Sequence, residues 1–328
     1  MRYRKLGSTG FKVSEIGYGA WGIGEGEWKG SSEEKAFESL NLAIDNGVNF
    51  IDTALGYGDG KSEEIVGEAV RKRDERVYIG TKVPPKNEEY VPNPEVPVED
   101  AYPKDWIIEA TEKSLENLGQ DEIDLLQLHV WVDEWAKSDG WKEAISELKD
   151  SGMISSFGLS LVFPFPEEEP NYPARAIGTG LIDACNVVYN IYEQEKPQEN
   201  LFSLAEEEEV GVIARSPLDE GALTGKITPE TEFPEDDWRN WYFREDRKEE
   251  VYQRAQDLEW MIEEGEVESL PKGALRFGLS HSAVSTVIVG MRSPKHVEEN
   301  VSTSDTGPLP KSYLERLEDH AWHHNYWA

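Results

Sequence analysis

Four ionisable side chains stand at or just beyond the ends of three successive apolar runs in this sequence. Asp52 and Tyr57 follow the second of eight such runs, Lys82 ends the third, and His129 ends the fourth. An unpaired charge in apolar surroundings is costly, so we expect these side chains to be partners of one another. Held together, groups of these types can give and take protons during a reaction. The alternative is that all four are structural polar residues at strand ends.

The apolar runs are short and β-branched, and they alternate with amphipathic segments. This pattern predicts a parallel sheet whose strands are connected by helices. The eight candidate strands are Val13–Gly19, Asn49–Thr53, Val77–Lys82, Ile123–His129, Ile154–Ser160, Ile182–Asn190, Val212–Ser216 and Val284–Gly290. Because no break in composition divides the repeat, it predicts an α/β fold with one closed (β/α)8 TIM barrel domain over residues 1–328, in place of an open doubly wound sheet.

Helices and long connections complete this expected barrel. The segments Ser32–Asn46 and Asp105–Leu118 carry apolar residues at helical spacing along one face. Two long connections, Pro84–Pro103 and the aromatic-rich Asp219–Arg247, each follow a strand. They belong on the C-terminal face, where barrels keep their active sites, and are candidate walls of a substrate pocket. Each could instead be a solvated insertion.

Two glycine motifs suggest phosphate binding but lack its context. Gly17 to Gly22 satisfies G-x-G-x-x-G after a strand, yet the polar segment Ile23 to Ser31 separates it from the next helix. A dinucleotide site of the Rossmann type needs a helix to begin at the glycines. The run Gly58 to Ser62 ends like a P-loop, but Leu55 stands where the first glycine must be. We therefore reject both interpretations.

Three histidines near the C-terminus, at positions 320, 323 and 324, could face a metal ion at helical spacing. Nothing nearby in the sequence completes a set of ligands. The preferred interpretation is a solvated terminal helix, and no metal site is expected.

The charge of the chain limits its partners. It has 66 acidic and 33 basic residues, a formal net charge of −33, spread along its length. Nucleic acid and anionic membranes are unexpected partners, because phosphate binding needs clustered Lys and Arg. Such a chain repels itself at low salt, so its charge predicts a halophilic source. A merely acidic mesophilic protein is the alternative. No EF-hand loop is present to support calcium binding.

The cysteine content and the hydropathy predict where the protein works. The single cysteine, Cys185, is expected to be a buried thiol, and it fits a reducing compartment. The sequence has no run of 18 apolar residues, so we expect a soluble, cytoplasmic protein.

A series of motifs resembles the aldo-keto reductase family. In order along the chain these are Asp52-Thr53-Ala54 with Tyr57-Gly58, Thr81-Lys82, Asp124-Leu125-Leu126-Gln127-Leu128-His129 and Ser216-Pro217-Leu218. The resemblance runs from about Leu6 to Asn300 and implies an oxidoreductase that reduces aldehydes or ketones, or oxidises alcohols or sugars.

The resemblance implies a catalytic tetrad of Asp52, Tyr57, Lys82 and His129. A carbonyl that accepts hydride develops negative charge on its oxygen, and Tyr57 is the implied proton donor. Lys82 would lower the pKa of Tyr57 toward a useful range, and Asp52 would hold Lys82. His129 would orient the carbonyl oxygen or share in the proton relay.

The resemblance also implies NADP(H) as the preferred cofactor, with NAD(H) possible, bound without a Rossmann unit. The implied cofactor residues are Ala20, Trp21 and Asp52; Ser160 and Asn186 at the nicotinamide amide; Arg215, Ser216, Pro217, Leu218 and Lys226 along the pyrophosphate; and Gly290, Arg292, His296, Glu299 and Asn300 at the adenosine end. The chain departs from the common family pattern at Asn186 and His296, where glutamine is usual, and at Ala20, where threonine is usual.

The expected substrate is a small carbonyl compound or alcohol, and the expected pocket walls are Trp21, Trp28, Trp131 and Trp238. Two other functions are compatible with the fold. Some relatives serve as cofactor-binding auxiliary subunits, which would bind cofactor without turnover. An isomerase or lyase on a similar barrel would show turnover without oxidising the cofactor.

Overall fold

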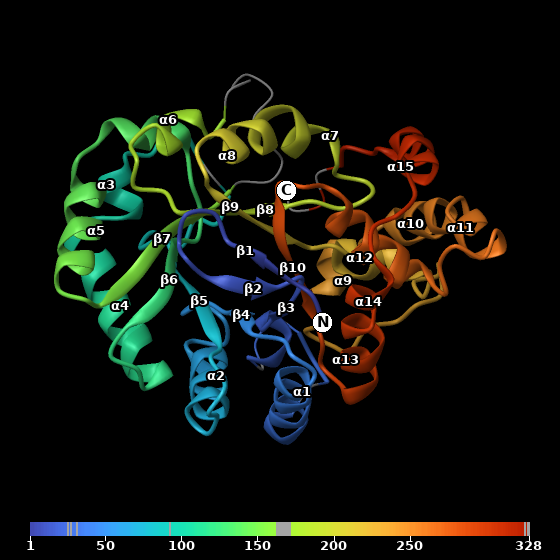
Figure 1. Ribbon diagram of the computed structural model, residues 1–328, viewed down its shortest axis with the longest axis horizontal. Coiled ribbons are helices and arrows are strands. Elements are labelled where there is room, and N and C mark those ends of the chain that lie inside the picture. The colour runs from blue at the N-terminus through green and yellow to red at the C-terminus, as the bar shows by residue number, and fades with distance from the viewer. Residues whose placement is uncertain are drawn as a thin grey trace.

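The barrel predicted from the alternating pattern is present. The computed structural model describes residues 1–24, 26, 28–30, 32–91, 93–161, 172–324 and 326. Eight parallel strands close in the order β10-β3-β4-β5-β6-β7-β8-β9 (Figure 1). They are β3 (Ile16–Gly19), β4 (Phe50–Asp52), β5 (Tyr78–Val83), β6 (Ile123–Leu128), β7 (Ile154–Ser160), β8 (Ala184–Val188), β9 (Gly211–Arg215) and β10 (Val284–Gly290).

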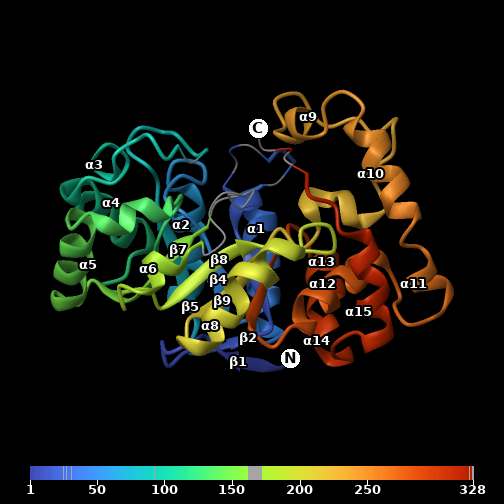
Figure 2. The ribbon, with the colours of Figure 1, turned by 90° about the horizontal axis from the view of Figure 1, so that it is seen from above.

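The first expected strand, Val13–Gly19, is divided into two strands with different partners. Its first part is β2 (Lys12–Ser14), which pairs antiparallel with β1 (Tyr3–Lys5), and only β3 joins the barrel. Leu6, Phe11 and Val13 of this hairpin pack against Phe50 and other residues inside the barrel. Figure 2 shows the hairpin at one end of the barrel and α9 (Arg239–Tyr242) toward the other. The hairpin therefore closes the end where the strands begin.

The hairpin approaches the barrel so closely that one position requires glycine. Gly7 has φ +52°, and a Cβ added there would lie 2.3 Å from the backbone nitrogen of Gly211. A larger residue would have to move β9 away from the hairpin.

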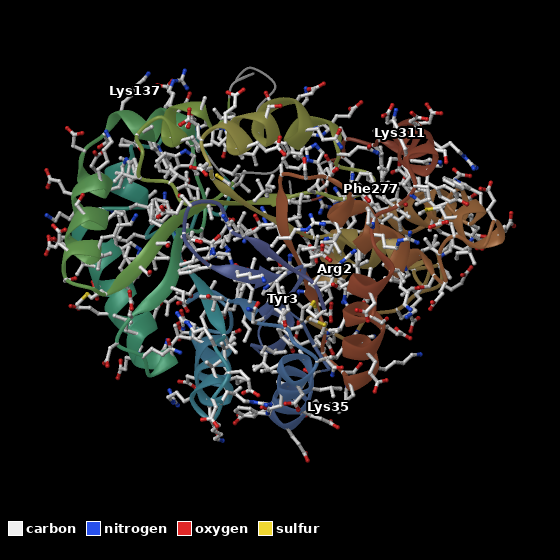
Figure 3. All side chains as sticks on the ribbon, in the orientation of Figure 1. Arg2, Tyr3, Lys35, Lys137, Phe277 and Lys311 are labelled. Carbon is white, nitrogen blue, oxygen red and sulfur yellow. The ribbon has the colours of Figure 1, made fainter. Side chains whose placement is uncertain are left out.

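Helices surround the barrel with their apolar faces inward. α1 (Glu33–Asp45) and α4 (Lys104–Leu118) lie where the spacing predicts, and Ser32 caps α1 by accepting a hydrogen bond from the Lys35 backbone. Charged side chains project outward, such as Lys35 on α1 and Lys311 on α15 (Figure 3). The other α-helices are α2 (Lys61–Arg71), α3 (Val98–Ala101), α5 (Gly140–Asp150), α6 (Ala174–Ile177), α7 (Glu195–Pro197), α8 (Ser203–Glu207), α10 (Arg247–Gln256), α11 (Trp260–Glu263), α12 (Leu270–Ser280), α13 (Pro294–Val301), α14 (Thr303–Thr306) and α15 (Lys311–Leu317).

The remaining sequence expectations about the fold have clear outcomes. Gly17 to Gly22 lies in β3 and the 3-10 turn η1 (Trp21–Ile23), and the first α-helix among the described residues begins at Glu33. This agrees with the rejection of the dinucleotide motif. Cys185 is completely buried in β8, and burial raises the pKa of its thiol. No helix in the described part of the chain is long and apolar enough to cross a membrane.

Candidate active site

A cavity of about 770 Å³ opens where the barrel strands end. Both long connections contribute to it, through Tyr90 and Val91 of the first and through several residues of the second, from Glu220 to Trp241. Their predicted place on the C-terminal face is therefore confirmed. Three members of the expected tetrad, Asp52, Tyr57 and His129, line this cavity.

Lys82 lies at the centre of the tetrad, beneath the cavity. Its Nζ donates hydrogen bonds to Asp52 Oδ1, to the Thr53 carbonyl at 2.8 Å and to Tyr57 Oη at 3.3 Å. The Lys82 and Asp52 side chains are only 1% and 3% exposed. Because β4 and β5 are neighbours, the ends of both strands meet at the same edge. The expected pairing of these residues is thus present.

Asp52 is held by more groups than the sequence suggested. Its Oδ2 accepts hydrogen bonds from Gln127 Nε2 at 3.1 Å and from Asn186 Nδ2 at 3.2 Å. Gln127 was not among the expected site residues, although a polar side chain between leucines of a buried strand was a usable signal. Asn186 is completely buried and is not among the residues that line the cavity, but its Oδ1 has no hydrogen-bond partner among the described residues, so the expected contact with a cofactor amide stays a prediction.

The net pKa of Tyr57 differs from the expectation. Burial raises the pKa of this hydroxyl, and the lowering effect of the Lys82 charge only partly offsets it. Lys82 thus acts on this pKa in the expected direction, but burial outweighs it and the net pKa lies above the ordinary value of a tyrosine. Burial also disfavours the charged form of Lys82, but Asp52 and Tyr57 outweigh that effect and raise its pKa. At neutral pH the pair is a protonated phenol beside an ammonium group.

His129 is a neutral imidazole at the cavity wall. Burial, and then the charges of Lys82 and Arg215, hold its pKa well below the usual value. Its ring lies edge-on to Tyr57 with centroids 5.6 Å apart, and its enclosed Nδ1 has no partner among the described residues. A neutral ring in this position can hydrogen-bond to an oxygen placed beside Tyr57.

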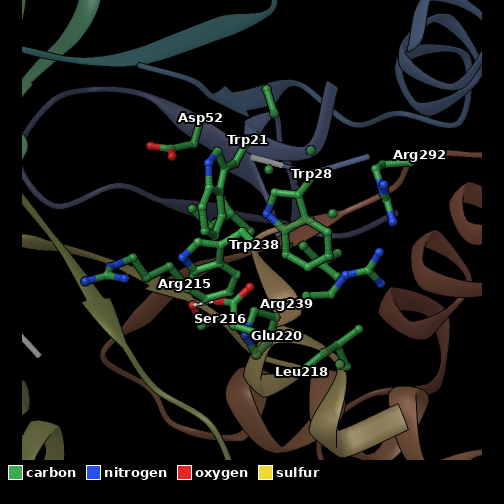
Figure 4. A pocket seen from close by; sticks show the side chains of 18 of the residues that line it. Trp21, Trp28, Asp52, Arg215, Ser216, Leu218, Glu220, Trp238, Arg239 and Arg292 are labelled. Carbon is green, nitrogen blue, oxygen red and sulfur yellow. Dashed lines mark hydrogen bonds between the residues drawn. The ribbon is translucent and has the colours of Figure 1, made fainter. Parts of the chain in front are cut away.

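The residues expected along the pyrophosphate, Arg215, Ser216, Pro217, Leu218 and Lys226, all line the cavity. The Arg215 side chain also reaches the end of β7, where its guanidinium donates to the Leu161 carbonyl at 3.1 Å. Its charge lowers the pKa of both Tyr57 and His129. Figure 4 shows Arg215 pointing away from Glu220. Arg215 therefore lies closer to the tetrad than its expected role implies.

The turn after β9 has an unusual backbone. Ser216, Asp219 and Glu220 have φ of +50°, +46° and +55°, which non-glycine residues rarely adopt. Ser216 Oγ donates to Glu220 Oε1 at 2.8 Å. Burial raises the pKa of the Glu220 carboxyl to about 7, against the opposing effect of that hydrogen bond. Glu220 also lines the cavity and was not among the expected site residues.

The residues expected at the adenosine end lie at the end of β10, in the turn that follows it and along α13. Gly290, Arg292, His296, Glu299 and Asn300 all line the cavity. Burial, and after it the charge of Lys226, lowers the pKa of His296, so Lys226 faces the same region. The Arg292 guanidinium donates to the Lys29 carbonyl at 2.9 Å and lies 5.0 Å from the Trp28 ring. Ala20 and Ser160 line the cavity as well.

Three of the four expected pocket tryptophans form one cluster over the cavity (Figure 4). Trp21 lies 5.5 Å from Trp28 and 5.0 Å from Trp238, measured between ring centroids. The expectation for Trp131 is corrected. Its side chain is completely buried and packs against Trp141 at 5.2 Å, outside the lining of the cavity.

The expected solvated terminal helix is also corrected for part of the histidine group. His320 ends a short 3-10 turn, whereas His324 lies outside any helix and is buried against Glu193 and Asp219. In the residues that the structure describes, no group of three or more His, Cys, Asp or Glu side chains could hold a metal ion.

Comparisons with known proteins agree with this geometry. A family model described as Aldo/keto reductase family matches residues 15–321. The aldo-keto reductase YhdN of Bacillus subtilis is 32% identical over 305 residues, 91% of this chain and 87% of the relative. A probable voltage-gated potassium channel subunit beta of Arabidopsis thaliana is 28% identical over 327 residues, 94% of this chain and 93% of that protein. The solved holo form of aldo-keto reductase AKR11C1 from Bacillus halodurans has a TM-score of 0.77 at 28% identity, covering 99% of this chain and 97% of that one.

Proposed function

The chain belongs to the aldo/keto reductase family, and we propose that it transfers hydride between a nicotinamide cofactor and a carbonyl carbon, with Tyr57 as the proton donor. The observation that carries this proposal is the contact of Tyr57 Oη with Lys82 Nζ at the cavity wall. In the reducing direction the carbonyl carbon gains a hydride and its oxygen gains the Tyr57 proton, so the carbonyl becomes an alcohol. The ammonium of Lys82 stabilises the phenolate that this transfer leaves.

The residues around the cavity fit a nicotinamide cofactor, which when bound supplies or accepts the hydride. The unpartnered Oδ1 of Asn186 can accept from an amide, and Ser160 lies near it at the end of β7. Lys226 and Arg292 provide positive charge for phosphates. At Gly290 an added Cβ would meet no atom within 4 Å, which leaves room for a ligand to approach the backbone. We propose NADP(H) as the preferred form, with NAD(H) as a possible substitute.

Cofactor absorbance measured with a panel of aldehydes, ketones and sugars tests the proposed function. Turnover that consumes or produces reduced cofactor supports it. An auxiliary subunit, as the name of the potassium channel relative suggests for that protein, would bind cofactor and turn over no member of the panel. Product formation without a change in absorbance would indicate isomerase or lyase chemistry.

Arg292 is expected to distinguish the two cofactors. A charge-assisted hydrogen bond to the 2′-phosphate contributes roughly 1.5–3 kcal/mol, so Arg292→Ala should weaken NADPH binding by at least about ten-fold and NADH binding far less. Fluorescence titration with both cofactors measures this. Arg239→Ala is the matched control, because Arg239 lines the same cavity but is already paired with Asp237. Equal losses for both cofactors in Arg292→Ala would exclude this role.

Glu220 is expected to make cofactor binding pH-dependent. Its carboxyl, with a pKa of about 7, is neutral below that pH and anionic above it. An anion beside the cofactor phosphates costs about 1 kcal/mol at 4 Å even in water, or about five-fold in affinity. NADH should therefore bind more weakly at about pH 8.5 than at about pH 6, and Glu220→Gln should bind equally at both. A pH dependence that survives in Glu220→Gln would assign the titration to another group.

Stability is expected to rise with salt. We propose a halophilic, cytoplasmic setting on the basis of the net charge of −33 and the single buried thiol. Carboxylates repel one another at low ionic strength, and screening shortens to roughly 3 Å at 1 M salt. The melting temperature should therefore increase from about 0.1 M to about 3 M KCl. No increase over this range would contradict the proposal.

A further inference from the structure

The segment that follows α15 runs toward α9, at the end of the barrel where the strands end (Figure 2). Residues 321–324 and 326, which we call the terminal segment, lie against the connections that follow β8 and β9. The Trp322 backbone nitrogen donates to the Tyr192 carbonyl at 2.8 Å, and the His324 nitrogen donates to Glu193 Oε1 at 2.8 Å. At its far end, Arg247 donates to the Tyr326 carbonyl at 3.0 Å. The terminal segment is thus fixed along its length.

His324 joins two acidic residues from separate connections. Its Nδ1 lies 3.1 Å from Glu193 Oε1 and its Nε2 lies 3.2 Å from Asp219 Oδ2. The imidazole is 3% exposed and stacks on Trp322, with centroids 4.0 Å apart and planes 9° from parallel. Burial disfavours its charged form, but Asp219 and Glu193 outweigh burial and raise its pKa to about 10. At neutral pH an imidazolium therefore lies between two buried carboxylates.

Asp219 connects this imidazolium to the cavity. Its backbone nitrogen donates to the Ser216 carbonyl at 3.0 Å, and its Oδ1 accepts from Tyr242 Oη at 2.9 Å. Its chain neighbours, Leu218 and Glu220, both line the cavity. The positive φ at Asp219 and Glu220 is an unfavourable backbone conformation that persists only when surrounding contacts hold it. Contacts of the Asp219 side chain with His324 and Tyr242 can supply that restraint.

We propose that His324 is a positioning residue for cofactor binding: by holding Asp219, it keeps the turn from Ser216 to Gly221 in the conformation that receives the cofactor phosphates. This inference rests on the proposed nicotinamide-dependent function. His324 touches neither the cavity nor the tetrad, so its loss acts on cofactor affinity and leaves the proton-transfer groups in place. Truncating the terminal segment has the same effect, because it removes the same imidazolium.

The test compares His324→Gln with the wild type by NADPH fluorescence titration and by steady-state kinetics. We expect the Kd and the KM for NADPH to rise by at least about ten-fold, while kcat at saturating cofactor stays within about two-fold. His320→Gln is the matched control, because His320 lies at the start of the same region and its ring contacts Trp260, 6.4 Å away between centroids. The control should bind NADPH like the wild type.

The outcomes separate this inference from the proposed function. Wild-type affinity in His324→Gln overturns the inference alone, and so does an equal loss in His320→Gln. A wild-type protein that binds neither NADPH nor NADH overturns the proposed function and the inference with it. If His324→Gln does not fold, the double variant Asp219→Asn with His324→Gln carries the test, because position 219 then presents no carboxylate to the neutral side chain, while Glu193 keeps its hydrogen bond from the backbone nitrogen of residue 324. Weakened NADPH binding in the double variant supports the inference, and wild-type binding overturns it.

Discussion

Replacing Tyr57 by phenylalanine is expected to lower kcat by about 10²–10⁴ and to leave cofactor affinity nearly unchanged. The substitution removes the hydroxyl that contacts Lys82 Nζ at 3.3 Å and keeps the ring that faces His129. Because burial raises the pKa of Tyr57, the wild-type hydroxyl carries its proton at neutral pH and can deliver it. His129 is a neutral imidazole without the acidic proton of an imidazolium, so it cannot take over as the proton donor.

The measurement pairs steady-state rates with cofactor titrations. Tyr90→Phe is the matched control, since Tyr90 also lines the cavity and its ring also faces His129, with centroids 5.2 Å apart. The control should retain most of the wild-type rate. If Tyr57→Phe keeps more than about a tenth of wild-type turnover, Tyr57 is a packing residue and another group donates the proton.

The barrel was predictable because its signal repeats. Each strand of a parallel barrel is buried on both faces and therefore appears as a short apolar run. Eight such runs separated by amphipathic helices identify the barrel from local sequence alone, without knowledge of contacts between distant residues. The division of Val13–Gly19 was not predictable in this way. Both parts of that segment are apolar and extended, and only the pairing of β2 with β1 shows that the chain changes partners at Glu15.

The meeting of Asp52 with Lys82 was predictable for the same reason. Polar residues that end neighbouring apolar strands meet at one edge of a barrel. Residues beyond the strand ends lack this constraint, and the place of Tyr57 beside Lys82 was expected from the family resemblance. Trp131 lies only two residues after His129, yet its side chain turns into the core, where Trp135 and Trp141 surround it. The periodicity of apolar residues predicts which way a side chain points within a helix or strand, but not within a connecting segment.

Contacts between distant segments were beyond sequence reasoning. His324 meets Asp219 only because the terminal segment runs alongside the connections that follow β8 and β9, and no local sequence pattern indicates that path. The pKa of Tyr57 illustrates a related limit. The sequence identified the neighbouring ammonium, but the degree of burial, which decides the sign of the net shift, depends on the whole enclosure of the site.

Replacing Lys82 by methionine is expected to lower both stability and activity. Lys82 and Asp52 are a buried ion pair, and removing one partner leaves the other charge uncompensated, at a cost of about 3–5 kcal/mol. Gln127 and Asn186 still donate to Asp52 Oδ2 in the variant, but neutral amides replace no positive charge. Tyr57 also loses the cation that opposes the rise in its pKa and would stabilise its phenolate.

Denaturant unfolding and steady-state kinetics on Lys82→Met, and on the double variant with Asp52→Asn, separate the two effects. The double variant leaves no buried charge at this pair, so it should recover most of the lost stability. It should not recover activity, because Tyr57 still lacks its ammonium neighbour, and kcat should stay lower by at least about 10² in both variants. Wild-type stability in Lys82→Met would contradict the ion pair. Recovery of the rate in the double variant would show instead that Lys82 serves the fold alone and that proton transfer from Tyr57 does not need it.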